Sequence, residues 1–207
     1  MKKENSIIIG TGVIGGYLSK LLLAKKHRVI VTSRKIKKNY INYSKLNIEK
    51  KVIFEKLDFL KKKKILDIIK KYNPNYIFYF SGQGSLTKSI NLKKETNDSN
   101  YVGAKKFLEI LHKYKFKSKF YKANSGYIFE SKNGLIDINS KISSNNNPYI
   151  KSQIKAYQEV KKFRKRGVNS SNLIFMQVES PLRNNDFLIK KICEHAKSKK
   201  NISLGNL

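Results

Sequence analysis

Short runs of apolar residues alternate along this chain with longer stretches in which apolar residues recur every three or four positions. Short apolar runs are typical of strands buried on both faces, and the longer period is that of one helix face. The predicted strands are Ser6–Gly10, Arg28–Thr32, Val52–Leu57, Tyr76–Phe80, Lys119–Ala123 and Leu173–Val178. The predicted helices are Val13–Lys25, Leu60–Tyr72, Asn100–Tyr114, Pro148–Arg166 and Asp186–Lys197.

The alternation of strands and helices sets the expected fold class. Such repeats build a mostly parallel sheet, and right-handed crossovers place helices on both of its faces. We therefore expect an α/β protein with a Rossmann-like, doubly wound parallel sheet flanked by helices. The polar segment 139–147 reads as a surface loop or lid before the helix that starts at Pro148.

A glycine pattern follows the first predicted strand directly and opens the first predicted helix. Gly10, Gly12 and Gly15 fit G-x-G-x-x-G, with Val13 and Ile14 between the last two glycines. In this context the first glycine permits a tight turn, the second lets the backbone approach a pyrophosphate, and the third lets the helix pack on the strand. Free N–H groups at the helix N-terminus favour the anion. The pattern predicts a dinucleotide cofactor; the alternative is a plain glycine-rich turn.

The end of the second predicted strand bears on which dinucleotide is bound. A site for NAD places Asp or Glu there to hold the ribose hydroxyls, and residues 32–35 contain neither. Ser33 and Arg34, with Lys35, could instead clamp a 2′-phosphate. This favours NADP over NAD; the alternative is that Arg34 is only one more exposed cation.

The strongly basic net charge is weak evidence for nucleic-acid binding. The net charge is +31, yet only five of the 45 basic residues are Arg, and the lysines are spread over the whole chain. Proteins that recognise nucleic acids use Arg forks and local clusters with stacking aromatics. Composition therefore does not favour nucleic-acid binding.

Cysteine, histidine and apolar content set further bounds. A single cysteine, Cys193, excludes an internal disulfide and fits a reducing cytoplasm. The sequence contains no run of about 18 apolar residues, so no membrane span is predicted. The three histidines lack metal-ligand spacing, so no metal site is expected.

Two hydroxyl side chains are candidates for chemistry. Tyr149 starts a predicted helix, where it could act as an acid–base group if a cation lowered its pKa. The residue one turn later on the same face is Gln153, so the expected cation is missing. Ser125, just past the fifth strand, could face a substrate. The alternatives are an ordinary tyrosine, and a helix cap or turn residue at Ser125.

Several motifs together resemble one family, along essentially the whole chain. They are Gly12-x-x-Gly15-Gly16-Tyr17-Leu18, Leu57-Asp58, Asn73-Pro74-Asn75, Tyr79–Gln83, Asn100-x-x-Gly103, Tyr121–Ser125, Pro148-Tyr149, Glu179–Arg183 and Leu204–Leu207. The chain resembles the extended short-chain dehydrogenase/reductases (the NAD-dependent epimerase/dehydratases), and within them the GDP-mannose 4,6-dehydratase family. Glu179–Arg183 and Leu204–Leu207 are the most specific of these matches.

The resemblance implies roles for individual residues. It implies catalysis by Ser125 and Tyr149, with Tyr127 and Gln153 at the positions of the family's Glu and Lys. The implied cofactor contacts are Gly10, Gly12, Val13, Ile14, Gly15, Ser33, Arg34, Asp58 (against the adenine), Ser81, Gly82, Gln83, Tyr149 and Gln153. The implied substrate contacts are Ser85, Glu179, Ser180 and Arg183.

The resemblance also implies a reaction and an assembly. NADP would take a hydride from C4 of GDP-mannose, water would leave from C6, and the hydride would return to C6. Because the elimination base and the lysine are replaced, the alternative is a catalytically impaired, cofactor-binding partner subunit. We expect residues 1–178 to form the NAD(P)-binding domain and 179–207 to begin a substrate-binding portion that is incomplete here. The family further implies a homo-oligomer.

Overall fold

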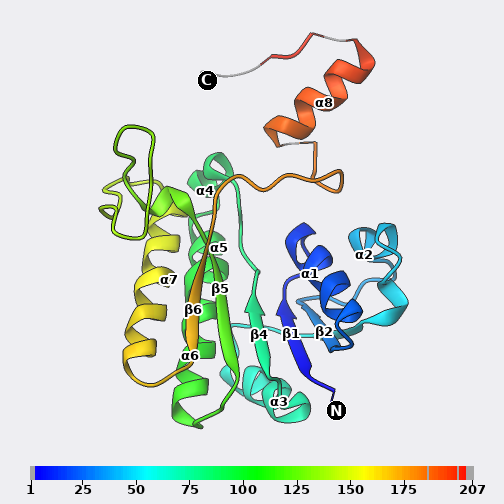
Figure 1. The fold of residues 1–207 in the computed structure, drawn as a ribbon, viewed down its shortest axis with the longest axis vertical. Helices are drawn as coiled ribbons and strands as arrows, with labels where there is room; N and C mark the ends of the chain where they lie inside the picture. Colours follow the sequence, from blue (N-terminus) through cyan, green and yellow to red (C-terminus); the bar gives the residue numbers. More distant parts are fainter. Residues whose placement is uncertain (1–2, 186, 200, 204–207) are drawn as a thin grey trace. The chain divides into compact units, whose positions relative to one another are not determined.

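Six parallel strands form one sheet in the order β3-β2-β1-β4-β5-β6. The computed structural model of the protein describes residues 3–185, 187–199 and 201–203 (Figure 1). The strands are β1 Asn5–Ile9, β2 Arg28–Ser33, β3 Ile53–Lys56, β4 Tyr76–Tyr79, β5 Lys119–Ser125 and β6 Ser170–Phe175. This strand order is that of a doubly wound, dinucleotide-binding sheet, so the expected fold class is confirmed.

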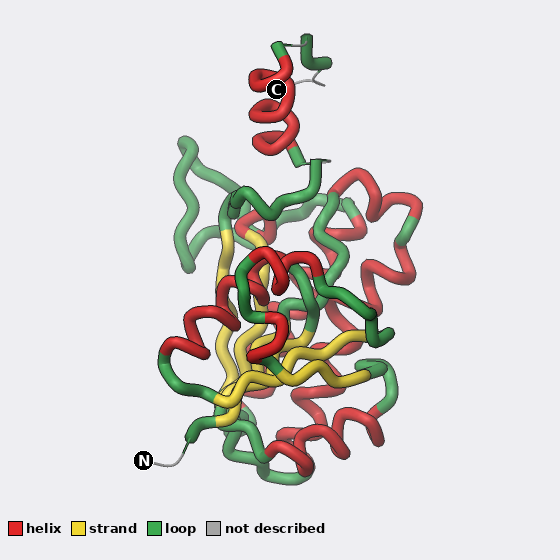
Figure 2. Tube along the Cα trace, turned by 90° about the vertical axis from the view of Figure 1, so that its right-hand side faces the viewer, coloured by secondary structure: helices red, strands yellow, loops and turns green. Residues whose placement is uncertain are grey.

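Helices connect the strands and cover both faces of the sheet, as the rotated view in Figure 2 shows. The α-helices are α1 Val13–Ala24, α2 Ile41–Lys45, α3 Lys62–Tyr72, α4 Leu86–Asn91, α5 Lys93–Asn97, α6 Gly103–Lys113, α7 Pro148–Lys165 and α8 Leu188–Ser198. Short turns of other helical types are η1 Glu49–Lys51, η2 Asp98–Val102 and η3 Gly126–Ile128. The segment 139–147 contains neither helix nor strand, as expected of a loop.

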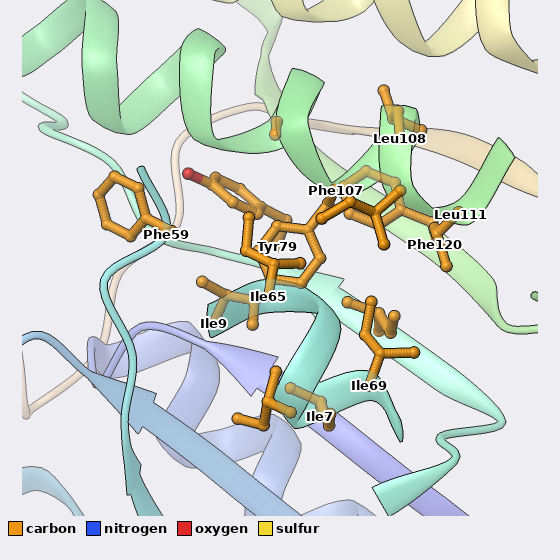
Figure 3. Packing of buried hydrophobic residues seen from close by; sticks show 14 of the residues in the cluster. Ile7, Ile9, Phe59, Ile65, Ile69, Tyr79, Phe107, Leu108, Leu111 and Phe120 are labelled. Atoms are coloured by element: carbon orange, nitrogen blue, oxygen red, sulfur yellow. The ribbon is translucent and has the colours of Figure 1, made fainter. Parts of the chain in front are cut away.

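The main core lies between the sheet and the helices α3, α6 and α7. Figure 3 shows Ile7 and Ile9 of β1 and Tyr79 of β4 packing against Ile65 and Phe107 from α3 and α6. Each large apolar side chain buried in this way contributes roughly 1.5–3 kcal/mol. The core thus holds the carboxyl ends of β1 and β4 in fixed register.

The last strand differs from its prediction. The apolar pattern predicts a strand over Leu173–Val178, whereas β6 runs from Ser170 to Phe175 and pairs with β5 from Phe120↔Ser170 onward. Ser170 is polar but buried, and its hydroxyl donates to the carbonyl oxygen of Val160 at 3.2 Å. The first three residues of β6 are polar, so an apolar pattern does not mark where the strand starts. Ser170 is buried there because its hydroxyl finds a partner in α7.

The helical segment before β5 also differs from its prediction. The periodicity predicts a single helix over Asn100–Tyr114, but α4, α5 and one π-helical turn, η2, precede α6. The π-helical turn contains Ser99 and Asn100, which are both buried. Helices of five or six residues, such as α2, α4 and α5, offer too few apolar repeats to be recognised from periodicity.

The chain divides into two compact units, residues 1–176 and residues 177–207. The first contains the whole sheet. The second contains α8, which spans Leu188–Ser198; the predicted start of this helix, Asp186, lies outside the described residues. The closing motif Leu204–Leu207 also lies outside them.

Candidate functional site

The glycine turn lies where β1 and β4 end side by side, which is the switch point of the strand order. Gly10 has φ +110°, and a Cβ there would come within 3.1 Å of the Ser81 nitrogen. Both the dihedral angle and the close approach of the β4 loop therefore require glycine. In open α/β sheets, ligands bind in the crevice at such a switch point.

The other two glycines differ in the space around them: Gly12 is open, and Gly15 packs closely on the start of the turn. A Cβ at Gly12 would meet nothing within 4 Å, whereas one at Gly15 would lie 3.1 Å from the Gly10 carbonyl oxygen. Gly12 is the N-cap of α1, and neither a capping side chain nor an acidic residue occupies the first turn. The N-terminal amides of α1 therefore lack a side-chain cap, and the backbone at Gly12 is open to a close approach, which suits a diphosphate.

The end of β2 carries the side chains expected to select the cofactor. The Ser33 hydroxyl donates to the Lys35 carbonyl oxygen at 2.8 Å, and Arg34 Nη2 lies 3.2 Å from Glu95 Oε1 of α5. Both side chains of this ion pair are about half exposed or more, at 65% and 46%. An exposed pair contributes only about 0–1 kcal/mol, so a phosphate could replace Glu95 at low cost.

Arg34 and Asp58 meet at one cavity of about 430 Å³. Asp58 follows β3 and accepts the backbone N–H of Leu60 at 3.0 Å. Phe59, Leu60, the end of α4 and residues of α5 and η2 complete the lining. The structure thus brings together two residues that the sequence places 24 positions apart, on the β2–β3 side of the switch point.

The loop after β4 is tied to helix α7 by one buried amide. Asn100 Nδ2 donates to the Gln83 carbonyl oxygen at 3.1 Å and to the Ser152 hydroxyl at 3.0 Å. Gly82 packs so closely on Asn100 that any Cβ would overlap its oxygen. Asn100 itself is 1% exposed. Sequence analysis singled it out only as part of a motif, and the structure assigns it the role of fixing residues 81–83.

Ser125, Tyr149 and Gln153 lie on β5 and the first turns of α7. Ser125 caps η3, accepting the N–H of Tyr127 at 3.3 Å, which realises the capping alternative. Tyr149 is half-buried at the start of α7, and its N–H donates to Asn147 Oδ1 at 2.9 Å. Gln153 is 5% exposed, whereas Tyr127 is 60% exposed. Tyr127 carries a phenol and no carboxylate, so it does not supply the carboxylate base that the resemblance implies at this position.

Lys122, which sequence analysis named only as part of the motif Tyr121–Ser125, contacts Gln153 from β5. Lys122 of β5 is 1% exposed; its Nζ donates to the Ala123 carbonyl oxygen and lies 3.4 Å from Gln153 Oε1. Burial lowers the pKa of Lys122 to about 7. The available sequence signal is its place at an inward position of an alternating strand, between buried Phe120 and Asn124.

The residues expected to hold substrate fall in both units. In the first unit, Ser85 is the N-cap of α4 and accepts the N–H of Lys88 at 3.2 Å. In the second, Arg183 lies 4.0 Å from Glu179 and stacks its guanidinium 3.7 Å from the Phe187 ring. Ser180 accepts the N–H of Leu182 at 3.1 Å. These contacts order the Glu179–Arg183 turn.

Membrane spans and metal clusters are both absent from residues 3–185, 187–199 and 201–203. No helix there combines the length and apolar character needed to cross a bilayer. Nor do His, Cys, Asp and Glu side chains of these residues gather in a group that could hold a metal ion.

Comparison with solved structures shows the same fold in nucleotide-sugar enzymes. UDP-glucose 4-epimerase from Thermotoga maritima, solved with UDP-glucose, matches with a TM-score of 0.81 and 19% identity over 96% of this chain and 64% of its own. The dTDP-glucose 4,6-dehydratase DesIV from Streptomyces venezuelae, solved with NAD and TYD bound, matches with a TM-score of 0.81 and 16% identity. The match covers 94% of this chain and 62% of DesIV. The chain spans less than two thirds of the length of either structure.

At the level of sequence, no curated protein matches the chain significantly. The family model described as GDP-mannose 4,6 dehydratase, however, matches residues 7–207, which is nearly the whole chain. The strand order and the glycine turn at the switch point agree with that match. The chain therefore belongs to the GDP-mannose 4,6 dehydratase family, and it shares its fold with the solved epimerase and dehydratase structures.

Proposed function

We propose that the protein binds NADP at the switch point of its sheet and acts on a nucleotide sugar, with GDP-mannose as the substrate. The observation that carries this is the open turn at Gly12, where an added Cβ would meet nothing within 4 Å, together with the cavity lined by Arg34 after β2 and Asp58 after β3. Uncapped amides of α1 suit the pyrophosphate, and Asp58 suits the adenosine. Residues 1–178 would serve the cofactor and 179–207 would begin the substrate-binding portion.

The end of β2 and three cations of the cavity favour NADP over NAD. Arg34, Lys93 and Lys94 line the cavity beside the carboxylates Asp58, Glu95 and Asp98. The cations can meet a 2′-phosphate, and residues 32–35 hold no acid for the ribose hydroxyls. NAD accompanies the related dTDP-glucose 4,6-dehydratases of Streptomyces venezuelae and Bacillus anthracis. A preference for the 2′-phosphate of NADP is therefore expected to distinguish this chain from those two dehydratases.

Titration with NADP and NAD, followed by thermal unfolding, tests the cofactor proposal. A ligand at 100 times its Kd adds about 2.7 kcal/mol to the free energy of unfolding. Gly12→Val fills the open space at an allowed φ of −73°, so it should abolish the ligand-induced shift while leaving the unliganded melting temperature nearly unchanged. Full stabilisation of Gly12→Val by NADP would contradict the proposal.

The chemistry would be a 4,6-dehydration, for which a nicotinamide held at the glycine turn would supply reversible hydride transfer. Tyr149 would take the proton of the sugar 4-hydroxyl, and Ser125 would orient that hydroxyl. Tyr127 stands where the elimination base is needed, and loss of a general base typically costs ~10²–10⁴ in rate. Turnover is therefore expected to be slow.

The second candidate is a cofactor-binding partner subunit without turnover, favoured by Tyr127 and Gln153. Mass spectrometry after incubation with NADP and GDP-mannose separates the two. A 4-keto-6-deoxy product supports the enzyme, and NADP binding without product supports the partner subunit.

The assembly and compartment are proposed from the family and from composition. We propose a homo-oligomer of the reducing cytoplasm, in keeping with the free, exposed thiol of Cys193. Sedimentation velocity tests the assembly, and a monomer at micromolar concentration would contradict it.

A further inference from the structure

A buried lysine without an acidic partner faces the start of helix α7. Lys122 is 1% exposed, and none of the ion pairs among the described residues includes it. Its polar contacts are the Ala123 carbonyl oxygen and, at 3.4 Å, Gln153 Oε1. Its ammonium also lies 5.7 Å from the centre of the Tyr79 ring.

Packing alone gives no reason for an ammonium at this position. Burial without a carboxylate penalises the charged form, which is why the pKa of Lys122 falls to about 7. A methionine of similar length would fill the same space without the penalty. The amine is therefore best explained by the group it contacts on α7.

The contact fixes which way the Gln153 carboxamide points. When its oxygen accepts from Lys122, its NH₂ group is directed away from β5 and remains a donor. Gln153 follows Tyr149 by one helical turn, on the same face of α7. Ser125 lies three residues beyond Lys122 on β5 and therefore on the opposite face of the strand, so Tyr149 is the candidate hydroxyl residue that shares a face with Gln153.

We propose that Lys122 is a positioning residue, which acts through the Gln153 amide in place of the lysine missing from α7. Lys122 holds the amide oxygen toward β5, and the amide NH₂ then donates on the side of Tyr149. The role rests on the proposed function, because the cofactor and Tyr149 are what the NH₂ group would serve. The orientation of the amide itself does not depend on it.

A lysine placed at position 153 should be tolerated only when Lys122 is also replaced. Gln153→Lys alone would place a second ammonium against Lys122, and two buried like charges disfavour each other. The exchange variant Lys122→Gln/Gln153→Lys keeps one ammonium and one amide in contact. It should therefore behave more like the native protein than either single variant does.

The first experiment observes the amide without cofactor. In protein labelled with ¹⁵N in glutamine side chains, the Gln153 NH₂ signal should shift with a midpoint near pH 7. Of the groups facing Lys122, Tyr79 titrates, but burial raises its pKa, and Gln153 and Asn172 do not titrate. Lys122→Met should abolish the shift, and Lys119→Met, an exposed lysine on the same strand, should keep it. A Gln153 signal that is unchanged by pH and by Lys122→Met overturns the proposal.

The second experiment measures NADP affinity in a double-mutant cycle. Lys122→Gln and Gln153→Lys should each weaken binding by about 10-fold, and the exchange variant should return to within about 3-fold of the native Kd. Additive losses, about 100-fold in the exchange variant, would overturn the role proposed for the pair. If the native protein binds neither NADP nor NAD, the proposed function fails, and the amide titration alone decides the Lys122 contact.

Discussion

The role of a single residue can be inferred from this sequence where local backbone geometry alone determines it. The three glycine roles follow from the sequence because each concerns local geometry: the φ of Gly10, the open side of Gly12 and the close contact of Gly15. Lys122 could not be identified in this way. Its meaning depends on Gln153, which lies 31 positions further along the chain and meets it only through folding.

The glycine turn supplies a matched pair of substitutions. Gly10→Ala forces a side chain into φ +110° and against the Ser81 backbone, so it should lower the free energy of unfolding by about 1–3 kcal/mol. Gly12→Ala, at φ −73° with open space around it, should change stability by less than about 1 kcal/mol. Urea unfolding followed by circular dichroism measures both, and equal losses would contradict the assigned geometry.

Burial of Lys122 makes the stability of the protein depend on pH in a definite direction. Its pKa is about 7 in the folded chain, against the ordinary lysine value of 10.5 once the chain unfolds, so between these values the unfolded chain binds more protons. Stability therefore rises with pH across this window. Lys122→Met should be more stable than the native protein by about 1–4 kcal/mol below pH 7, with the difference shrinking toward pH 10. A difference independent of pH would show that the amine is not desolvated.

Elements were predictable where apolar periodicity is long and local. The strands β1, β2, β4 and β5 begin within a residue of their predicted starts, and α7 begins at Pro148 as expected. The short helices and η2 were missed because their positions are set by contacts with other elements. Asn100 shows this: its amide joins Gln83 to Ser152, and neither partner is near it in the sequence.

The π-helical turn η2 should therefore matter for both stability and binding. Asn100→Ala removes two hydrogen bonds and leaves the Gln83 carbonyl without that donor, so we expect a loss of about 1–3 kcal/mol. NADP affinity should fall as well, because residues 81–83 lose their anchor. Asn169→Ala, an exposed residue directly before β6 that does not line the cavity, is the control. Thermal unfolding with and without NADP measures both effects, and a variant with native stability would contradict the assignment.

At the scale of the whole chain, the two units differ in how they are held together. The main hydrophobic core, with members such as Ile7, Phe107 and Val168, lies entirely within residues 1–176. Helix α8 of the second unit buries none of its described residues. The main core and the glycine turn therefore belong to the first unit, whereas Glu179 and Arg183, expected to contact substrate, belong to the second.

Limited proteolysis should expose this difference. Met176 is 65% exposed, and residues 177–187 form no helix or strand where they are described, so cleavage should begin in this segment. The remaining fragment, about residues 1–176, should unfold at nearly the same temperature as the intact chain and keep its stabilisation by NADP. Mass spectrometry locates the cut and thermal unfolding compares the two species. Loss of NADP stabilisation on cleavage, with the fragment still folded, would place part of the cofactor site in residues 177–207 and move the functional boundary toward the C-terminus.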